Sequence, residues 1–237
     1  NIFDKELADR SKAGKNILQS GGNAVDAAIA VNIVQGVVAP ETCGVGGDLF
    51  ALIWRDGSVE PDCLDASGYA GSKVDGETIP GDTIPLNHPM SVTVPGAVDG
   101  WFKLHEKYGS LEMSKIFAAG IEICHEGFEI NQELAQSLDI HQSELGGQSS
   151  SVSFYKNLLP LTAGTHIRRV NLGKTLELIA NEGPDIFYKG EIASSISFLL
   201  YFFKNCLHLD TENCNPAFLI NLSCTISYSR HIFKPTD

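Results

Sequence analysis

The stretch that decides the fold is Gly21-Gly22-Asn23-Ala24-Val25-Asp26-Ala27-Ala28-Ile29-Ala30-Val31, in a chain of 237 residues. Asn23 is a favourable helix N-cap, and Asp26 stands three residues later, where a carboxylate meets free backbone amides. The residues that follow are nearly all small and apolar, which allows close approach to neighbouring elements. We therefore expect a central, almost wholly buried helix that ends at Val38, with both Ala27 and Ala28 tightly packed.

Helices and strands alternate around this segment, which is typical of an α/β protein. Spacings of three and four predict a preceding helix over residues 7–18. An apolar run predicts a buried strand over 49–54, and an Asp56-Gly57 turn then leads to a returning strand over 58–64. Further along the chain we expect a strand at 91–94, helices at 97–108, 113–126 and 172–180, an irregular connection at 71–90 and a flexible loop at 146–151.

Charge and hydropathy exclude two classes of partner. The chain carries 17 Lys and Arg against 29 Asp and Glu, a net charge of −12, so its field repels phosphates and disfavours nucleic-acid binding. No run reaches the ~18 apolar residues of a membrane-spanning helix, and the first residues lack the features of a signal peptide. Because the chain does not start with Met, we expect it to begin inside a longer protein, and its localisation is left unassigned.

The cysteines, histidines and glycines do not predict a metal or cofactor site. The six cysteines form no C-x-x-C pair, and the seven histidines show neither H-x-x-x-H nor H-E-x-x-H spacing. Cys43 is expected to be structural rather than nucleophilic, because the neighbouring Glu41 and Asp48 would raise the pKa of its thiol. The loop Gly44-Val45-Gly46-Gly47 follows a helix and precedes a strand, the reverse of a phosphate cradle, and predicts a tight start to the strand.

The last 42 residues, 196–237, differ from the rest. They hold seven of the 20 aromatic residues and three of the six cysteines, with no clear helical or strand period. A small disulfide knot would explain this composition, but so would non-native sequence from a frameshift or a retained intron, and we favour the second explanation. We therefore divide the chain into residues 1–195 and a divergent, non-native or disordered tail at 196–237.

A series of motifs resembles the large subunit of gamma-glutamyltransferases, also called glutathione hydrolases. The motifs follow the family order from about residue 5 to 195: Gly21–Ala28, Val37-Val38-Ala39-Pro40-Glu41, Gly44–Gly47, Val94-Pro95-Gly96, Gly100-Trp101, His105-Glu106-Lys107-Tyr108-Gly109, Glu126-Gly127-Phe128, Leu172-Gly173-Lys174-Thr175-Leu176 and Phe187-Tyr188-Lys189-Gly190-Glu191-Ile192-Ala193. Such ordered agreement is more specific than any single motif.

The resemblance implies the large-subunit portion of an incomplete N-terminal-nucleophile hydrolase, an αββα sandwich made as a self-cleaving precursor. In this family the nucleophile is a threonine at the start of a separate small subunit, whose own amine serves as general base. That threonine lies downstream of the matched region, so the resemblance places no catalytic residue in this chain and implies that the chain alone is inactive. Thr165-His166 precedes the matched Leu172 helix and is expected to be a loop.

The resemblance also locates a substrate-contact segment after the returning strand. The family has an arginine here that binds the alpha-carboxylate of a gamma-glutamyl group, whereas this chain has Leu64-Asp65-Ala66-Ser67-Gly68-Tyr69-Ala70. Ser67 and Tyr69 are the candidate substrate-binding residues, in a pattern closer to members that resemble acylases or oxamate amidohydrolases. The leading hypothesis is part of a hydrolase for gamma-glutamyl or related amides; the alternative is a truncated, non-catalytic binding protein.

Overall fold

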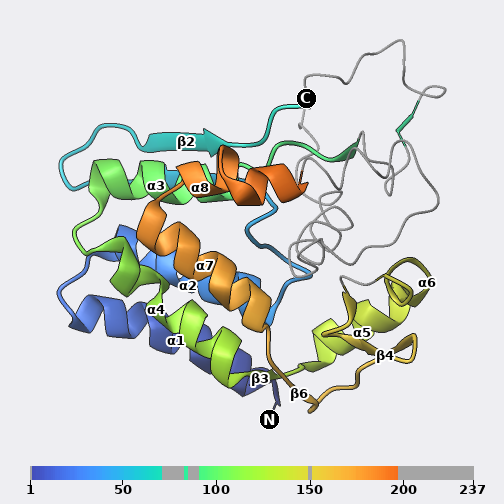
Figure 1. The fold of residues 1–237 in the computed structure, drawn as a ribbon. Helices are drawn as coiled ribbons and strands as arrows, with labels where there is room; N and C mark the ends of the chain where they lie inside the picture. Colours follow the sequence, from blue (N-terminus) through green and yellow to red (C-terminus); the bar gives the residue numbers. More distant parts are fainter. Residues whose placement is uncertain (1, 71–82, 85–90, 149–150, 197–237) are drawn as a thin grey trace, which may run out of the picture.

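A computed structural model describes residues 2–70, 83–84, 91–148 and 151–196, with side chains from residue 8 onward. The helices are α1 (Ile2–Gln19), α2 (Ala24–Val38), α3 (Ala97–Tyr108), α4 (Met113–Glu126), α5 (Gln132–Ile140), α6 (Gln142–Leu145), α7 (Val170–Glu182) and α8 (Asp185–Tyr188) (Figure 1). The long helices match their predicted positions. The tail from residue 197, most of the 71–90 connection and residues 149–150 lie outside the described residues.

The described strands form three antiparallel pairs. They are β1 (Leu49–Ile53) with β2 (Asp62–Ala66), β3 (Phe128–Glu129) with β6 (His166–Ile167), and β4 (Tyr155–Lys156) with β5 (Leu159–Pro160). The fold is mixed α/β, but two stacked sheets, as an αββα sandwich requires, do not occur within the described ranges. The strand expected at 91–94 is reduced to one bridge between Ala70 and Thr93.

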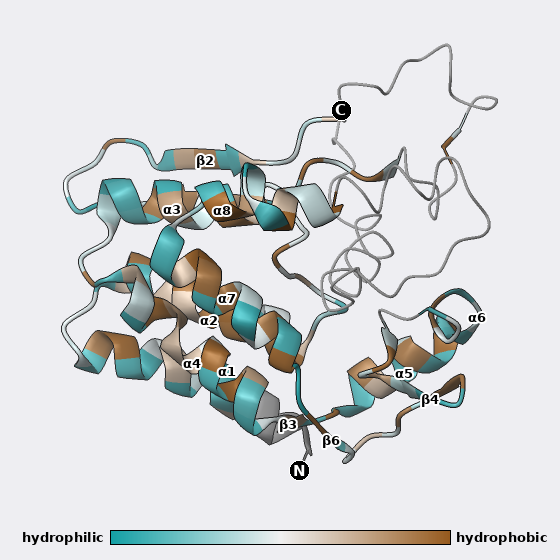
Figure 2. Ribbon diagram, in the orientation of Figure 1, coloured by the Kyte–Doolittle hydropathy of each residue, from teal (hydrophilic) through white to brown (hydrophobic). Residues whose placement is uncertain are grey.

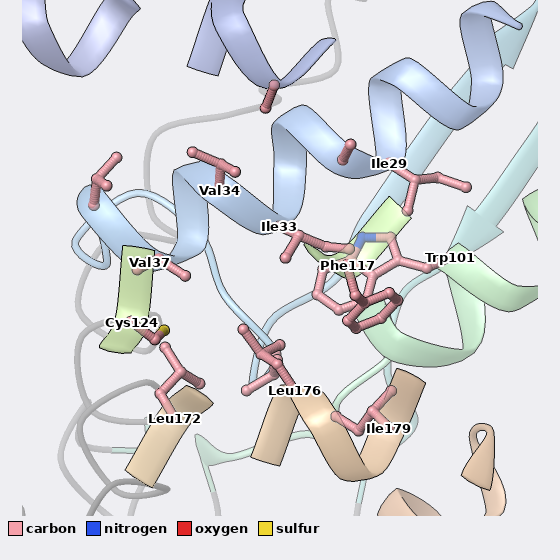
Figure 3. Packing of buried hydrophobic residues seen from close by; sticks show 14 of the residues in the cluster. Ile29, Ile33, Val34, Val37, Trp101, Phe117, Cys124, Leu172, Leu176 and Ile179 are labelled. Atoms are coloured by element: carbon pink, nitrogen blue, oxygen red, sulfur yellow. The ribbon is translucent and has the colours of Figure 1, made fainter. Parts of the chain in front are cut away.

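Helix α2 lies at the centre of the apolar core. Ile29, Ile33 and Val34 are almost fully buried, and Figure 3 shows Ile33 on the side of α2 that faces Phe117 of α4 and Leu176 of α7, with Val34 on the other side of the helix. A Cβ built on Gly120 of α4 would lie 2.6 Å from Ile33 Cγ2, so a larger residue there could not keep this helix contact. The helices alternate between hydrophobic and hydrophilic residues in Figure 2, as helices with one buried side must.

Asp26 fixes the N-terminus of α2 to the corner between α3 and α4. Asn23 Oδ1 accepts from the N–H groups of Val25 (2.8 Å) and Asp26 (3.1 Å), and Asp26 Oδ2 accepts from Asn23 N–H (2.9 Å), which completes a capping box. Ser110 donates to Asp26 from its N–H (3.0 Å) and its hydroxyl (2.6 Å). Burial alone would raise the pKa of Asp26, but the hydrogen bonds from Ser110 and Asn23 lower it overall.

Arg169 fixes the other end of α2. Its Nη1 donates to the carbonyl oxygens of Gly36 and Val37, both at 2.9 Å, and its guanidinium lies 5.3 Å from the centre of the Phe154 ring. The side chain is buried. A positive charge beside the last carbonyl groups also opposes the negative end of the helix dipole, so Arg169 acts as a C-terminal cap supplied by a distant segment.

The expected complete burial of α2 is wrong on one side. Ala27 is buried, but Ala24 and Ala28 are exposed, because residues four apart share the side of α2 that faces away from the packed helices. Only Ala27 of the predicted alanine pair is therefore tightly packed.

The β1–β2 hairpin packs one face against α3 and the core. The inward residues of β1 are Leu49, Ala51 and Ile53, which lie against the core cluster. The Asp56-Gly57 turn is present, with Gly57 at φ 75°, but the returning strand begins at Asp62 rather than at residue 58. Tyr108 donates its hydroxyl proton to Asp62 at 2.6 Å and so ties the hairpin to the end of α3.

The sequence predicts a buried strand at 49–54, and this prediction is wrong for its outward side. Phe50, Leu52 and Trp54 are 69%, 75% and 64% exposed. Nearly continuous apolar residues are typical of strands that are covered on both faces. Within the described residues, only one face of this hairpin is covered.

Candidate functional site

The glycine loop, Gly44–Gly47, connects α2 to β1 and accepts backbone hydrogen bonds from the start of α3. The carbonyl oxygen of Gly47 accepts hydrogen bonds from the N–H groups of Gly96 (3.0 Å) and Ala97 (2.9 Å), at the start of α3. The loop thus supplies an acceptor, whereas a phosphate cradle must supply donors. A Cβ on Gly36 would lie 3.1 Å from Gly44 Cα, so the expected close backbone packing before the strand is confirmed.

The segment that continues β2, residues 67–70, is held in place by two neighbouring segments. Gly68 N–H donates to Asp48 Oδ1 (2.8 Å), and Val94 N–H donates to the carbonyl oxygen of Tyr69 (2.9 Å). A Cβ on Gly68 would lie 1.8 Å from the Val94 carbonyl oxygen, so no other residue fits this approach without backbone movement. The segment at 67–70 is therefore positioned by Asp48, which directly precedes β1, on one side and by residues 93–94 on the other.

The structure brings Ser67 and Tyr69 to the same face of the ribbon. Alternation along β2 and its continuation leaves positions 63, 65, 67 and 69 exposed, and Tyr69 is 86% exposed. The strand register sets Asp65 opposite Phe50, so this face also carries the exposed apolar side chains of β1. The two candidate residues stand at one end of an outward-facing surface.

Two carboxylates, those of Asp65 and Asp48, give the surroundings of this segment a negative charge. Ser67 N–H donates to Asp65 Oδ1 at 2.9 Å, and hydrogen bonds from the Ser67 backbone and then its side chain lower the pKa of Asp65, which keeps this carboxyl ionised. Asp48 holds the adjacent N–H of Gly68. The N–H groups of Ser67 and Gly68 are thus occupied by protein carboxylates.

Tyr188 is a supporting residue whose role the sequence did not reveal. Its hydroxyl donates to the Pro95 carbonyl oxygen (2.7 Å) and accepts from Asp99 N–H (2.9 Å), and burial raises its pKa to about 12. The phenol therefore stays neutral and connects α8 to Pro95 and Asp99, next to residues 93–94, which hold the segment after β2. Sequence reasoning relates Asp48 only to Cys43, and its hydrogen bond to the N–H of Gly68 is not predicted by any local pattern.

Thr165 and His166 lie elsewhere. Thr165 belongs to the turn before β6, where its carbonyl oxygen accepts from Ile130 N–H at 2.9 Å, and His166 Nε2 bonds the Glu126 carbonyl oxygen at 3.0 Å. Figure 1 shows β6 at the opposite end of the molecule from β2. The expected loop position is confirmed for Thr165, but it is wrong for His166, which begins β6 and pairs with Glu129 of β3.

The other candidate residues have structural partners. His105 contacts the Leu111 carbonyl oxygen at 2.6 Å and His125 contacts Glu177 at 2.9 Å, while His88, His208 and His231 lie outside the described residues.

Cys43 is half-buried, and its pKa is raised to about 11. Burial is the main cause and Glu41 adds to it, whereas the predicted contribution of Asp48 is absent. The thiol is protonated at neutral pH, as a structural cysteine should be.

Across the part of the chain that the structure describes, no three His, Cys, Asp or Glu side chains gather in a way that could hold a metal ion. The same part contains no helix with the length and apolar character needed to cross a membrane.

Comparison with known proteins places these features in a family. The family model described as Gamma-glutamyltranspeptidase matches residues 10–199. The glutathione hydrolase proenzyme of Escherichia coli is 34% identical over 198 residues, which are 80% of this chain and 34% of the relative. The chain thus spans about a third of the length of the curated relatives that it matches.

Solved structures agree with this match. Helicobacter pylori gamma-glutamyltranspeptidase gives a TM-score of 0.74 at 30% identity, over 79% of this chain and 56% of that chain. A cephalosporin acylase from Bacillus halodurans gives 0.75 at 28% identity, over 91% of this chain and 40% of that chain. These matches support the family as a whole and not specifically its acylase-like members.

Proposed function

The chain belongs to the gamma-glutamyltranspeptidase family, and on that premise we propose that it is the N-terminal part of the large subunit of an amide hydrolase. The parent enzyme cleaves or transfers gamma-glutamyl or related acyl groups from glutathione-like amides. It does so through an acyl-enzyme on the threonine of a small subunit, whose free amine is the general base. The observation that carries this proposal is the ordered match over residues 10–199.

The segment at Ser67–Tyr69 is the proposed substrate contact. Its support is the placement of this segment, which Asp48 and Val94 hold through the backbone of Gly68 and Tyr69. The side chains of Ser67 and Tyr69 face outward, where a substrate could reach them, and that of Ser67 also hydrogen-bonds Asp65. Binding groups on turns that a rigid frame positions are common in enzymes.

The proposed substrate is a related amide rather than a standard gamma-glutamyl compound. No arginine stands in the 64–70 segment. A substrate carboxylate at this turn would meet hydroxyl groups and the carboxylates of Asp48 and Asp65, and the loss of a charged hydrogen bond costs on the order of 1.5–3 kcal/mol. The acylase-like pattern Ser67-Gly68-Tyr69 fits this preference.

The proposed parent fold is the αββα sandwich. Its support is the hairpin face at Phe50, Leu52 and Trp54, since apolar side chains on both faces of a strand suit a sheet with a second layer. The parts that complete the sandwich, among them the small subunit, belong to the remaining two thirds of the relatives' length.

The 237-residue chain is proposed to be inactive and not to cleave itself. Both reactions need the small-subunit threonine and the groups that hold the developing oxyanion. Thr165 lies inside the chain, between Gly164 and His166. Its backbone nitrogen therefore belongs to a peptide bond and cannot act as a general base. The tail at 196–237 is proposed to be a separate, poorly packed segment.

A gamma-glutamyl anilide assay on the purified chain, with Thr165→Ala as its control, tests the inactivity. No turnover is expected from either protein, and turnover that disappears in Thr165→Ala would contradict the proposal.

Sequencing the full-length transcript tests the assignment to a parent enzyme. A reading frame that resumes the family pattern beyond residue 196 and reaches a Thr-Thr-His-like motif is expected. A transcript that encodes these 237 residues and no nucleophile would favour the alternative, a non-catalytic binding protein.

A further inference from the structure

Helix α3 begins without a side-chain cap from its own N-cap residue, which is Gly96. The first N–H groups of a helix have no partner inside the helix, so other segments must supply acceptors. The carbonyl oxygen of Gly47 accepts from the N–H groups of Gly96 and Ala97. The hydroxyl of Tyr188, in α8, accepts from the N–H group of Asp99 at 2.9 Å, although the two residues are 89 positions apart. Tyr188 therefore acts as an N-terminal cap that a distant segment supplies to α3.

The same hydroxyl also holds the residue that precedes the N-cap. Tyr188 donates its proton to the carbonyl oxygen of Pro95 at 2.7 Å. Burial raises the pKa of Tyr188 to about 12, so the phenol keeps this proton at neutral pH. A hydroxyl can donate and accept at once, which lets one oxygen atom bridge the residues on both sides of Gly96. Figure 1 shows α8 next to α3, as this bridge requires.

The start of α3 and the segment after β2 touch backbone to backbone. A Cβ built on Gly96 would overlap the carbonyl oxygen of Ala66, and a Cβ built on Gly68 would overlap the carbonyl oxygen of Val94. The N–H group of Val94 also donates to the carbonyl oxygen of Tyr69 at 2.9 Å. Because no side chain lies between the two segments at these points, a shift at the start of α3 displaces the segment after β2 or opens a gap beside it.

We propose that Tyr188 is a positioning residue for the substrate contact at Ser67 and Tyr69. Its hydroxyl fixes the start of α3 through Pro95 and Asp99, and the start of α3 in turn fixes the backbone that presents the two contact side chains. The proposal rests on the function proposed above, because only there does this segment contact a substrate. Both hydrogen bonds of the hydroxyl go to backbone groups, so Tyr188 acts through the backbone and does not touch the substrate.

Tyr188→Phe tests the proposal on the full chain, because it removes the hydroxyl and keeps the ring that packs edge-on against Phe187, with 5.0 Å between the ring centroids. Tyr155→Phe is the matched control. It removes another phenol hydroxyl that donates to a backbone carbonyl oxygen, that of Leu138 in α5, at 2.6 Å. Circular dichroism checks that each variant folds.

Hydrogen exchange, read by mass spectrometry, measures the effect of each variant on the two segments. In Tyr188→Phe we expect exchange at residues 64–70 and 94–100 to become at least about fivefold faster, because two backbone groups lose a buried partner. Tyr155→Phe should leave both segments unchanged and speed exchange in α5. Similar increases at residues 64–70 in both variants would show a general loss of stability and would overturn the proposal.

NMR of the chain labelled with ¹⁵N-glycine gives a readout that a merely structural role would not move, because the chemical shifts of the folded state report local geometry. We expect Tyr188→Phe to shift the amide signals of Gly68 and Gly96 and to leave that of Gly164, beside β6, in place. Tyr155→Phe should leave the Gly68 and Gly96 signals unchanged. Unchanged Gly68 and Gly96 signals in Tyr188→Phe would overturn the proposal. Loss of the folded state in that variant would overturn it too, because the hydroxyl would then hold the whole core.

These outcomes are independent of those that test the proposed function. Turnover by the chain in the anilide assay, or a transcript without a nucleophile, would leave the effect of Tyr188 on the segment unchanged. An unmoved Gly68 signal would remove the role of Tyr188 and leave the proposed function as it stands. The two proposals therefore fail separately.

Discussion

The helical core around α2 and the β1–β2 hairpin differ in how completely their apolar surfaces are used. Helix α2 is tied at its N-terminus by Asp26 and at its C-terminus by Arg169, and its long apolar side chains are buried. The hairpin has the same apolar character but only one packed face. The comparison teaches that the two regions differ in packing: the described core is packed around α2, whereas the outer face of the hairpin, beside the proposed substrate contact, is exposed within the described residues.

The largest expected effect comes from removing the hydrogen bonds that Asp26 accepts from Asn23 and Ser110 at the N-terminus of α2. Asp26→Ala removes the capping carboxylate and leaves the Ser110 and Asn23 donors without their acceptor. We expect a loss of roughly 2–4 kcal/mol in the free energy of unfolding, measured by urea denaturation. Asp56→Ala, at the exposed hairpin turn, is the control and should change it by less than about 0.5 kcal/mol. Equal losses of unfolding free energy in the two variants would show that the Asp26 hydrogen bonds do not stabilise the fold more than an exposed turn residue does.

Overpacking distinguishes the two sides of α2. Ala27→Leu inserts a larger side chain into the buried side and should cost roughly 1–3 kcal/mol. Ala28→Leu places the same side chain on the exposed side and should be close to neutral. The two denaturation midpoints provide the check, and a reversed order would mean that α2 packs on its other side.

Acid should weaken the hydrogen bonds of the Asp26 carboxylate over a defined range of pH. The pKa of Asp26 is lowered in the folded chain, so its contribution to stability is present above its unfolded pKa of about 3.9 and is lost as the pH falls through the folded value. The difference in unfolding free energy between the wild type and Asp26→Asn should therefore be constant from pH 7 to about pH 5 and shrink below about pH 4. A constant difference down to pH 2 would contradict the assigned pKa shift.

The smallest effect is expected on the hairpin. Leu52→Ser removes an exposed apolar side chain and should change the unfolding free energy of the monomer by less than about 0.5 kcal/mol. Thermal denaturation of the two proteins under identical conditions is the measurement. A loss as large as that of Ala27→Leu would show that the outer face is covered in the monomer.

Sequence reasoning succeeded where the determining contacts are local. The cap at Asn23 and the small residues after it predicted α2, and glycines marked the ends of its neighbours. Helix α5 was missed although Asn131 caps it and Leu134 and Leu138 are buried at a spacing of four, so the signal was present. Strands β3 to β6 have two residues each, too few for any periodicity.

The parts that sequence could not supply depend on distant contacts. Arg169 caps α2 from more than 130 residues away, and no local pattern identifies its carbonyl partners. At the candidate site, the positions of Ser67 and Tyr69 came from the family resemblance. The carboxylates that hold their turn became visible only when β1 and β2 were paired, because the Asp48–Gly68 bond spans 20 residues.

Hydrogen exchange on the whole 237-residue chain, read segment by segment by mass spectrometry, tests most directly the claim that residues up to 195 contain a complete core. The account predicts the slowest exchange in α2, α4 and α7, faster exchange in the β1–β2 hairpin, and fast exchange after residue 196. Strong protection after residue 196, or exchange in α2 as fast as in the hairpin, would contradict it.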